Sequence, residues 1–301
     1  MSTDRLALFT VVYPGVERFL AGWYRSVVSQ TDDDFDLWIS LDGLSIDECR
    51  AAMGARRSKI NFLAASGKTP ARIRHAAVGL LVEQYSSVVF VDSDDLLLSK
   101  RVESARRALE RYDLTGCALR IMDEDERDLS VTFQPPDGDG FDTLLPRYNV
   151  FGLSNTAYRG DLLRRCLPIP DDCQCIDWLL ATRAWALDAE MHFDPVPGMA
   201  YRQYDANVAR VLPPFSGAGI TRATERVLNH YRCVLNGIGP FRKGRRSLIE
   251  DACRRAESFY RAIMNSAEVL DRYAEALNKI KPQYIWWWCV AHPDLESIWK
   301  N

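Results

Sequence analysis

Three short apolar runs alternate with helix-like segments in the first 92 residues of the chain. The runs are LALFTVV at 6–12, FDLWISLDG at 35–43 and SVVFVD at 87–92, and they are rich in β-branched and aromatic residues. Between them, segment 16–30 places apolar residues at helical spacing, and segment 71–85 is predicted to be a helix that opens at Thr69–Pro70. This alternation predicts an α/β fold with a mostly parallel sheet. Ligands of such sheets bind beyond the carboxyl ends of the strands.

Carboxylates follow two of these runs, at the predicted carboxyl ends of the strands. Asp42 follows the second run, and Asp92, Asp94 and Asp95 follow the third. Three carboxylates so close together repel one another, so a cation or strong hydrogen-bond donors must offset the repulsion. The cluster therefore predicts a divalent metal that carries a nucleotide diphosphate. The alternative is turn chemistry with helix capping.

The composition is that of a globular protein. Apolar residues make up 47% and charged residues 26% of the chain, which allows a sizeable core. No apolar run reaches the length of about 18 residues that a membrane-spanning helix needs. The N-terminus lacks the pattern of a secretory signal, so the eight cysteines are interpreted as reduced thiols of a cytoplasmic protein. A net charge of −3 argues against nucleic acid as a partner.

The remainder of the chain is less regular. Segment 122–130 is acidic and is predicted to be a hairpin or turn, whereas 175–187 has the pattern of an amphipathic helix. Helical patterns dominate after Pro213–Pro214, which is the predicted domain boundary. The sequence thus predicts a domain over 1–212 and a helical C-terminal extension over 213–301.

Five ordered segments carry a family resemblance. They are RFLAGWYRSVVSQTDDDFDLWISLDGLS, GKTPARIRHAAV, VVFVDSDDLLLSKRV, CIDWLLATRA and YRQYDANVAR. In this order and spacing they resemble the family-2 glycosyltransferases with the GT-A fold, over roughly residues 5–212. The resemblance implies a Rossmann-like, mixed and mostly parallel sheet flanked by helices. It also implies that the domain over 1–212 is catalytic.

The resemblance implies roles for individual residues. Asp94 is expected to coordinate Mn²⁺ or Mg²⁺ at the diphosphate of a nucleotide sugar, with Asp92 in support. Asp95 resembles the turn residue that fastens the loop. Asp42 resembles the residue that accepts a hydrogen bond from the nucleobase, and Asp177 resembles the catalytic base. Three further contacts with the donor are expected. Tyr13 would stack on the nucleobase, and Arg202 would assist the leaving group. The third contact comes from an arginine with two competing alignments, Arg74 or Arg72.

The chain departs from the family pattern at several positions. The first loop reads VVYPG, which shifts Tyr13, and His75 replaces an asparagine. Ile176 stands where the family has a glutamate, and Tyr204 where it has a histidine. These departures keep open a catalytically silent nucleotide-sugar or glycan-binding module. A nucleotidyltransferase is a weaker alternative, because the first loop is not a glycine-rich, basic phosphate loop.

The combined pattern predicts an inverting glycosyltransferase of polysaccharide or glycoconjugate assembly. Its acceptor would be a glycan or a lipid-linked molecule, and the resemblance would place Asn155 and Tyr158 near the acceptor. The basic segment 241–246 and the Trp-rich segment 284–299 suggest peripheral contact with the inner face of a membrane. The alternative is that the tryptophans pack on the catalytic domain or on a second copy in a homo-oligomer.

Overall fold

The computed structural model describes residues 5–55, 59–65, 67–204, 207–237, 241–242 and 244–300. Asp205 and Ala206 of the YRQYDANVAR segment and Lys243 of the basic segment lie outside the described residues. The chain divides into two compact units. Unit 1 comprises residues 1–133, 151–172 and 188–204, and unit 2 comprises residues 134–150, 173–187 and 205–301.

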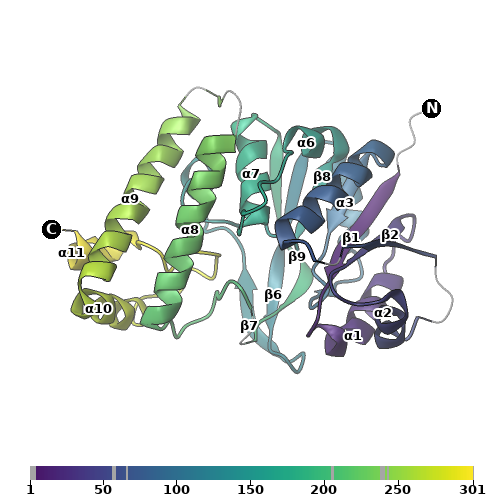
Figure 1. Ribbon diagram of the computed structural model, residues 1–301, viewed down its shortest axis with the longest axis horizontal. Coiled ribbons are helices and arrows are strands. Elements are labelled where there is room, and N and C mark those ends of the chain that lie inside the picture. The colour runs from purple at the N-terminus through teal and green to yellow at the C-terminus, as the bar shows by residue number, and fades with distance from the viewer. Residues whose placement is uncertain are drawn as a thin grey trace. The chain divides into compact units, whose positions relative to one another are not determined.

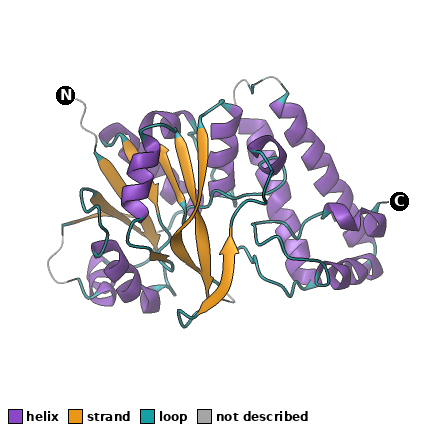
Figure 2. Cartoon of the chain, turned by 180° about the vertical axis from the view of Figure 1, so that it is seen from behind, coloured by secondary structure: helices purple, strands orange, loops and turns teal. Residues whose placement is uncertain are grey.

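Unit 1 contains the sheet, which Figure 2 shows in orange. Its strands are β1 (Leu6–Val12), β2 (Asp36–Leu41), β3 (Ile60–Ala64), β4 (Ser87–Phe90), β5 (Leu96–Leu97), β6 (Leu114–Met122), β7 (Asp128–Phe133), β8 (Thr156–Arg159) and β9 (Met191–Arg202). The strand order is β3-β2-β1-β4-β8-β6-β9-β5, with β7 paired to β6. Strands β3, β2, β1, β4, β6 and β9 run in one direction, and β8, β5 and β7 run antiparallel to their neighbours. The prediction of a mixed, mostly parallel sheet is confirmed.

The local sequence explains the central strands. All residues of β1 and β4 are buried, as expected of parallel strands covered on both faces. The predicted strands at 6–12, 35–43 and 87–92 correspond to β1, β2 and β4. The acidic segment forms the predicted hairpin, since the antiparallel strands β6 and β7 flank it and the Asp123 amide donates to the Arg127 carbonyl.

The helices among the described residues of unit 1 are α1 (Glu17–Val28), α2 (Ile46–Met53), α3 (Pro70–Gln84), α4 (Arg101–Leu109) and α6 (Gly160–Arg165). Helices α1 and α3 were predicted from the sequence. The Thr69 side chain caps α3 by accepting a hydrogen bond from the Arg72 amide, and Pro70 occupies the first turn. This cap fixes where α3 begins and therefore where its two arginines stand.

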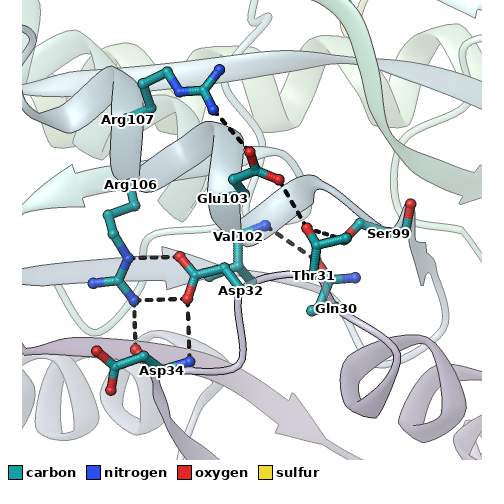
Figure 3. Close-up of polar contacts among 9 residues, drawn as sticks. All are labelled: Gln30, Thr31, Asp32, Asp34, Ser99, Val102, Glu103, Arg106 and Arg107. Carbon is teal, nitrogen blue, oxygen red and sulfur yellow. Dashed lines mark hydrogen bonds and ion pairs between the residues drawn. The ribbon is translucent and has the colours of Figure 1, made fainter.

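A polar network fastens the turn between α1 and β2 to the start of α4 (Figure 3). Arg106 binds both carboxylate oxygens of Asp32, at 2.6 and 3.1 Å, and lowers the pKa of that carboxyl. Gln30 accepts from the Val102 amide, and Thr31 donates to Glu103 at 2.9 Å. The Gln-Thr pair of the family-like first segment therefore positions the chain immediately after the carboxylate cluster.

Unit 2 is helical in the part that the structure describes. Its elements are α5 (Phe141–Leu144), α7 (Ile176–Ala186), α8 (Gly217–Gly237), α9 (Arg245–Asn265), α10 (Ala267–Leu277), a 3₁₀ turn (Pro293–Leu295) and α11 (Glu296–Trp299) (Figure 1). The prediction of an amphipathic α7 is wrong, because every residue of α7 except Asp177 is buried. The tryptophan ring of Trp178 stacks on the His230 ring of α8 with 3.8 Å between centroids. A helix that is enclosed on all sides has no polar face.

The Trp-rich segment packs inside unit 2. Trp286, Trp287 and Trp288 are all buried, and the Trp288 indole donates to the Val211 carbonyl while its ring meets Phe215 edge-on. These side chains therefore pack within the protein, as the second interpretation of this segment predicts, and peripheral membrane contact through the C-terminal region stays a prediction. No helix among the described ranges has both the length and the apolar composition to cross a membrane.

We expect the buried His230 to make the stability of the folded protein sensitive to acid. Burial lowers its pKa to about 3, and neither ring nitrogen has a hydrogen-bond partner among the residues that the structure describes. An unfolded histidine binds a proton near pH 6.5, so stability is full above that pH and falls as the pH drops through it. We expect unfolding free energy to decrease by about 2 kcal/mol between pH 7.5 and pH 5 on account of this residue.

Urea unfolding at pH 7.5, 6 and 5 measures this effect. His230→Phe keeps an aromatic ring against Trp178 but does not titrate, so the pH-dependent loss should shrink by most of that amount. His192→Phe, stacked on Tyr112 in unit 1, is the matched control and should retain the loss. An unchanged pH profile in His230→Phe would show that other groups cause the sensitivity.

Candidate functional site

Three adjacent parallel strands bring the predicted donor residues to one edge of the sheet. Tyr13 follows β1, Asp42 follows β2, and Asp92 and Asp94 follow β4. Strand β1 lies between β2 and β4 and pairs in parallel with both. The chain leaves β1 toward β2 on one side and returns to β4 on the other, which makes a topological switch point where open α/β sheets bind ligands.

Asp94 is buried and accepts a hydrogen bond from a tyrosine 110 positions later in the sequence. The residue is 7% exposed, and Tyr204 donates to its Oδ2 at 2.8 Å. Burial raises the pKa of Asp94, and the hydrogen bond from Tyr204 acts against that rise. Burial and the nearby Asp94 charge also raise the pKa of Tyr13 well above its usual value. Tyr204, noted from the sequence only as a departure, is thus part of the carboxylate site.

Asp95 fastens the loop, as predicted. It is 1% exposed and accepts hydrogen bonds from the Arg202 amide, at 2.8 Å, and from the Ser154 hydroxyl. Burial is the main reason that its pKa lies well above the usual range, and the charges of Asp94 and Asp92 add to the effect. Ser154 was not predicted, because nothing in its local sequence marks it as a partner of Asp95.

Arg202 is a buried structural residue in this arrangement. Its Nε donates to the Asp94 carbonyl at 2.7 Å, its Nη1 to the Glu124 carbonyl at 2.7 Å and its Nη2 to the Glu126 carboxylate at 3.1 Å. The guanidinium also lies 4.3 Å from the ring centroid of Phe19. The expected role of assisting a leaving diphosphate is corrected here, because these contacts direct the guanidinium inward and leave it without exposed surface.

The two arginines of α3 occupy different environments. Arg72 is exposed and forms an ion pair with Asp171, with 2.8 Å between Nε and the carboxylate. Arg74 is half-buried and donates to the Pro70 carbonyl at 3.4 Å. Asp42 is half-buried, and its amide donates to the Val12 carbonyl at 2.8 Å, which sets its side chain at the strand end. Both arginine alignments remain predictions.

Asp177 lies in the first turn of α7, in unit 2. It is half-buried, and the Asn149 side-chain amide donates to its Oδ2 at 2.8 Å. A carboxylate is favoured at this place because the N-terminus of a helix carries partial positive charge. Asn149 therefore orients the Asp177 side chain, which suits the predicted base.

Asn155 and Tyr158 do not form an exposed acceptor site, which corrects their predicted role. Asn155 accepts from the Gly152 amide and donates to the Cys117 carbonyl, both at 2.7 Å, and is fully buried. Tyr158 is buried on β8 and meets Phe90 edge-on. Both residues stabilise the sheet and the turn that leads into it.

The carboxylate donor set fits a hard divalent cation. Within the described ranges, no group of three or more His, Cys, Asp and Glu side chains has the arrangement of a metal site. An ion on a nucleotide diphosphate needs only one or two protein carboxylates, because phosphate oxygens and water complete its shell. Asp92 and Asp94 supply such oxygens, and the raised pKa of the buried Asp94 marks a place where positive charge would be stabilising.

Known proteins match this chain in structure but not in sequence. No protein-family model and no curated protein sequence matches the chain. The 1–349 fragment of S. aureus TarS, solved with UDP-GlcNAc, superposes with a TM-score of 0.60 at 15% identity, over 90% of this chain and 78% of that one. The same fragment solved with UDP gives 0.58 at 15% identity, over 92% and 75%.

A mannosyltransferase from Pyrobaculum calidifontis, solved with GDP-Man and Mn²⁺, gives a TM-score of 0.60 at 14% identity, over 98% of this chain and 85% of that one. The chain has the GT-A fold. At this level of sequence identity, the structural similarity shows the fold alone.

Proposed function

We propose that this protein is a glycosyltransferase that uses a nucleotide-sugar donor. The observation that carries the proposal is the convergence of Tyr13, Asp42, Asp92 and Asp94 beside the switch point of a GT-A sheet. The complexes of its structural neighbours with UDP-GlcNAc and with GDP-Man support a donor of this class. The proposed setting is polysaccharide or glycoconjugate assembly in the cytoplasm, with a glycan or lipid-linked acceptor and residues 1–212 as the catalytic domain.

Donor binding is assigned to the carboxyl edge of the sheet. Asp42 accepts a hydrogen bond from the nucleobase, and Tyr13 lies beside the nucleoside. Asp94, with Asp92, would hold Mn²⁺ or Mg²⁺ at the diphosphate. The bound ion would neutralise charge that develops on the leaving diphosphate. Tyr204 keeps the Asp94 carboxylate in place through its hydrogen bond.

The transfer step is assigned to Asp177. Its carboxylate accepts the proton of the acceptor hydroxyl, while the hydroxyl oxygen forms a bond to the anomeric carbon of the donor sugar. The bond between that carbon and the diphosphate breaks with its electron pair, and the nucleoside diphosphate leaves. Attack from the face opposite the diphosphate inverts the anomeric carbon. Asn149 orients Asp177 for this step.

A catalytically silent nucleotide-sugar or glycan-binding module is the second candidate. Two features favour it: Ile176 removes one of the two carboxylates that the family has before the base, and Asp94 already accepts a hydrogen bond from Tyr204. Such a module would bind a nucleotide sugar and leave it intact.

Donor turnover separates these candidates. The protein is incubated with UDP-, GDP-, dTDP- and CDP-sugars in Mn²⁺ or in EDTA, with water as the acceptor probe, and nucleoside diphosphate is quantified. We expect release from one donor in Mn²⁺, and a thermal shift that corresponds to about 2.7 kcal/mol at a nucleotide concentration a hundred times the dissociation constant. A thermal shift without release would favour the silent module. The absence of both the thermal shift and the release would contradict the donor site itself.

A further inference from the structure

Unit 2 contains a cavity of about 620 Å³ that the proposed transfer does not use. It lies among the start of α5, the segment after it, the exposed turns of α9 and the end of α11. Its walls include Asp142, Pro146, Arg147, Ala252, Arg255 and Trp299. A volume of this size is in the range of small-molecule sites in proteins, about 300–1,000 Å³.

Basic side chains outnumber the two acidic ones, Asp142 and Asp251, in the lining. Four basic side chains contribute to it: Arg147, Arg254, Arg255 and Lys300. Arg254 pairs with Asp251, and Arg255 and Lys300 share Glu296. Over the described ranges, Arg147 has no ion pair, and its Nη2 atom is buried without a hydrogen-bond partner. A buried guanidinium donor without an acceptor is rare in folded proteins and requires an explanation.

Other unpartnered donors surround Arg147. Trp299 lines the cavity and is 5% exposed, and its Nε1 has no acceptor in the part of the chain that the structure describes. In the same described part, the Tyr148 hydroxyl and the His292 Nε2 are also buried without partners. Arg147 is close enough to both residues to influence their titration. Several buried polar groups thus occupy one region, and each has an atom without a hydrogen-bond partner among the described residues.

The charges of Arg147 and Arg255 also act on each other. Burial lowers the pKa of Arg255, and the charge of Arg147 lowers it further, which means that the two guanidiniums repel each other. Arg255 directs Nε and Nη2 at the Ala291 carbonyl, at 3.0 Å each, so its position is fixed. A negative group between the two arginines would relieve the repulsion and accept from the free donors.

We propose that this cavity binds an oxyanion, the phosphate or carboxylate group of a small ligand, with Arg147 as its main donor. Arg147 donates to the anion through Nη2, and the Trp299 indole supplies a second donor. The apolar surfaces of Pro146, Leu248 and Ala252 accommodate the rest of the ligand. Its lining residues all belong to unit 2, whereas the proposed donor site consists of residues of unit 1.

Binding of inorganic phosphate, pyrophosphate and glucuronate to the full chain tests the proposal. Calorimetry and thermal shift are run in EDTA, against sodium chloride of the same ionic strength. We expect at least one probe to bind, and Arg147→Met to weaken it by about tenfold or more, since charge-assisted bonds to the anion are lost. Trp299→Phe keeps the ring against Phe259 and should weaken binding severalfold. Arg107→Met, an exposed arginine of α4, should leave it unchanged.

Folding stability without the anion gives an independent readout. Arg147 is half-buried, and methionine removes its buried Nη2, which has no acceptor among the described residues, so the melting temperature of Arg147→Met should equal or exceed that of the wild type. A large drop would show that the guanidinium is structural and would overturn the proposal. Three results of the binding test would overturn it as well. They are equal binding to Arg147→Met and to the wild type, a loss of binding in Arg107→Met as large as in Arg147→Met, and no binding of any probe. Failure of donor turnover would not affect these results, because no divalent ion or nucleotide is involved.

Discussion

Replacing Asp94 with asparagine is expected to lower Mn²⁺-dependent release of nucleoside diphosphate about a thousandfold, which is roughly 4 kcal/mol of lost stabilisation in the transition state. Asparagine keeps the shape of the side chain and can still accept from Tyr204. It lacks the negative charge that would hold the cation against the diphosphate. The measurement is the initial rate across a Mn²⁺ titration, together with the thermal shift given by the nucleoside diphosphate.

The controls for Asp94→Asn separate chemistry from folding. Because Asp94 is buried beside Asp92 and Asp95, removal of one charge should not lower the melting temperature of the protein without ligand. Asp33→Asn, an exposed change of the same kind in unit 1, should keep full activity. Full activity of Asp94→Asn at low Mn²⁺ would show that the carboxylate does not bind the ion, and turn chemistry would then explain the cluster.

Asp177→Asn is expected to lower the rate of sugar transfer by about a hundredfold to ten-thousandfold, the usual contribution of a general base. Asparagine can still accept from Asn149 but cannot take the proton of the acceptor hydroxyl. The affinity for nucleoside diphosphate should stay within about twofold of the wild type, because donor binding is assigned to unit 1. Single-turnover rates and calorimetry measure the two quantities separately.

Two further variants make the Asp177 result specific. Asn149→Ala removes the side chain that orients Asp177 and should give a smaller loss in rate, with unchanged affinity for nucleotide. Asp271→Asn, exposed on α10, should have no effect on either quantity. An active Asp177→Asn would overturn the assignment of the base while leaving the donor site intact.

Local sequence patterns were sufficient for the strands and helices nearest to the site. Strands β1 and β4 are uninterrupted apolar runs, and α3 carries both its threonine cap and its first-turn proline. Strand β9 was not predicted, because Pro195 and Pro197 are typical of loops or strand edges. It pairs in parallel with β6 nevertheless, and the register shifts near Ala118 accommodate the prolines. Strand β3 was missed because it is short and half-exposed, without a clear alternation of apolar residues.

The sequence by itself determined the class of fold and the position of the carboxylates, because both depend on short-range patterns: apolar periodicity, caps, and charges placed just after a strand. Only the tertiary structure decided what those carboxylates contact. Tyr204 reaches Asp94 across 110 positions, and Arg202 turns inward to three partners, because β9 is inserted beside β6 in the sheet. Likewise, only the tertiary structure shows that Arg147 Nη2 is buried with no acceptor in the described part of the chain, at a cavity lined by α9 and the last residues. Such contacts join distant segments, and hydrophobic burial of the whole fold, rather than any local preference, brings them together.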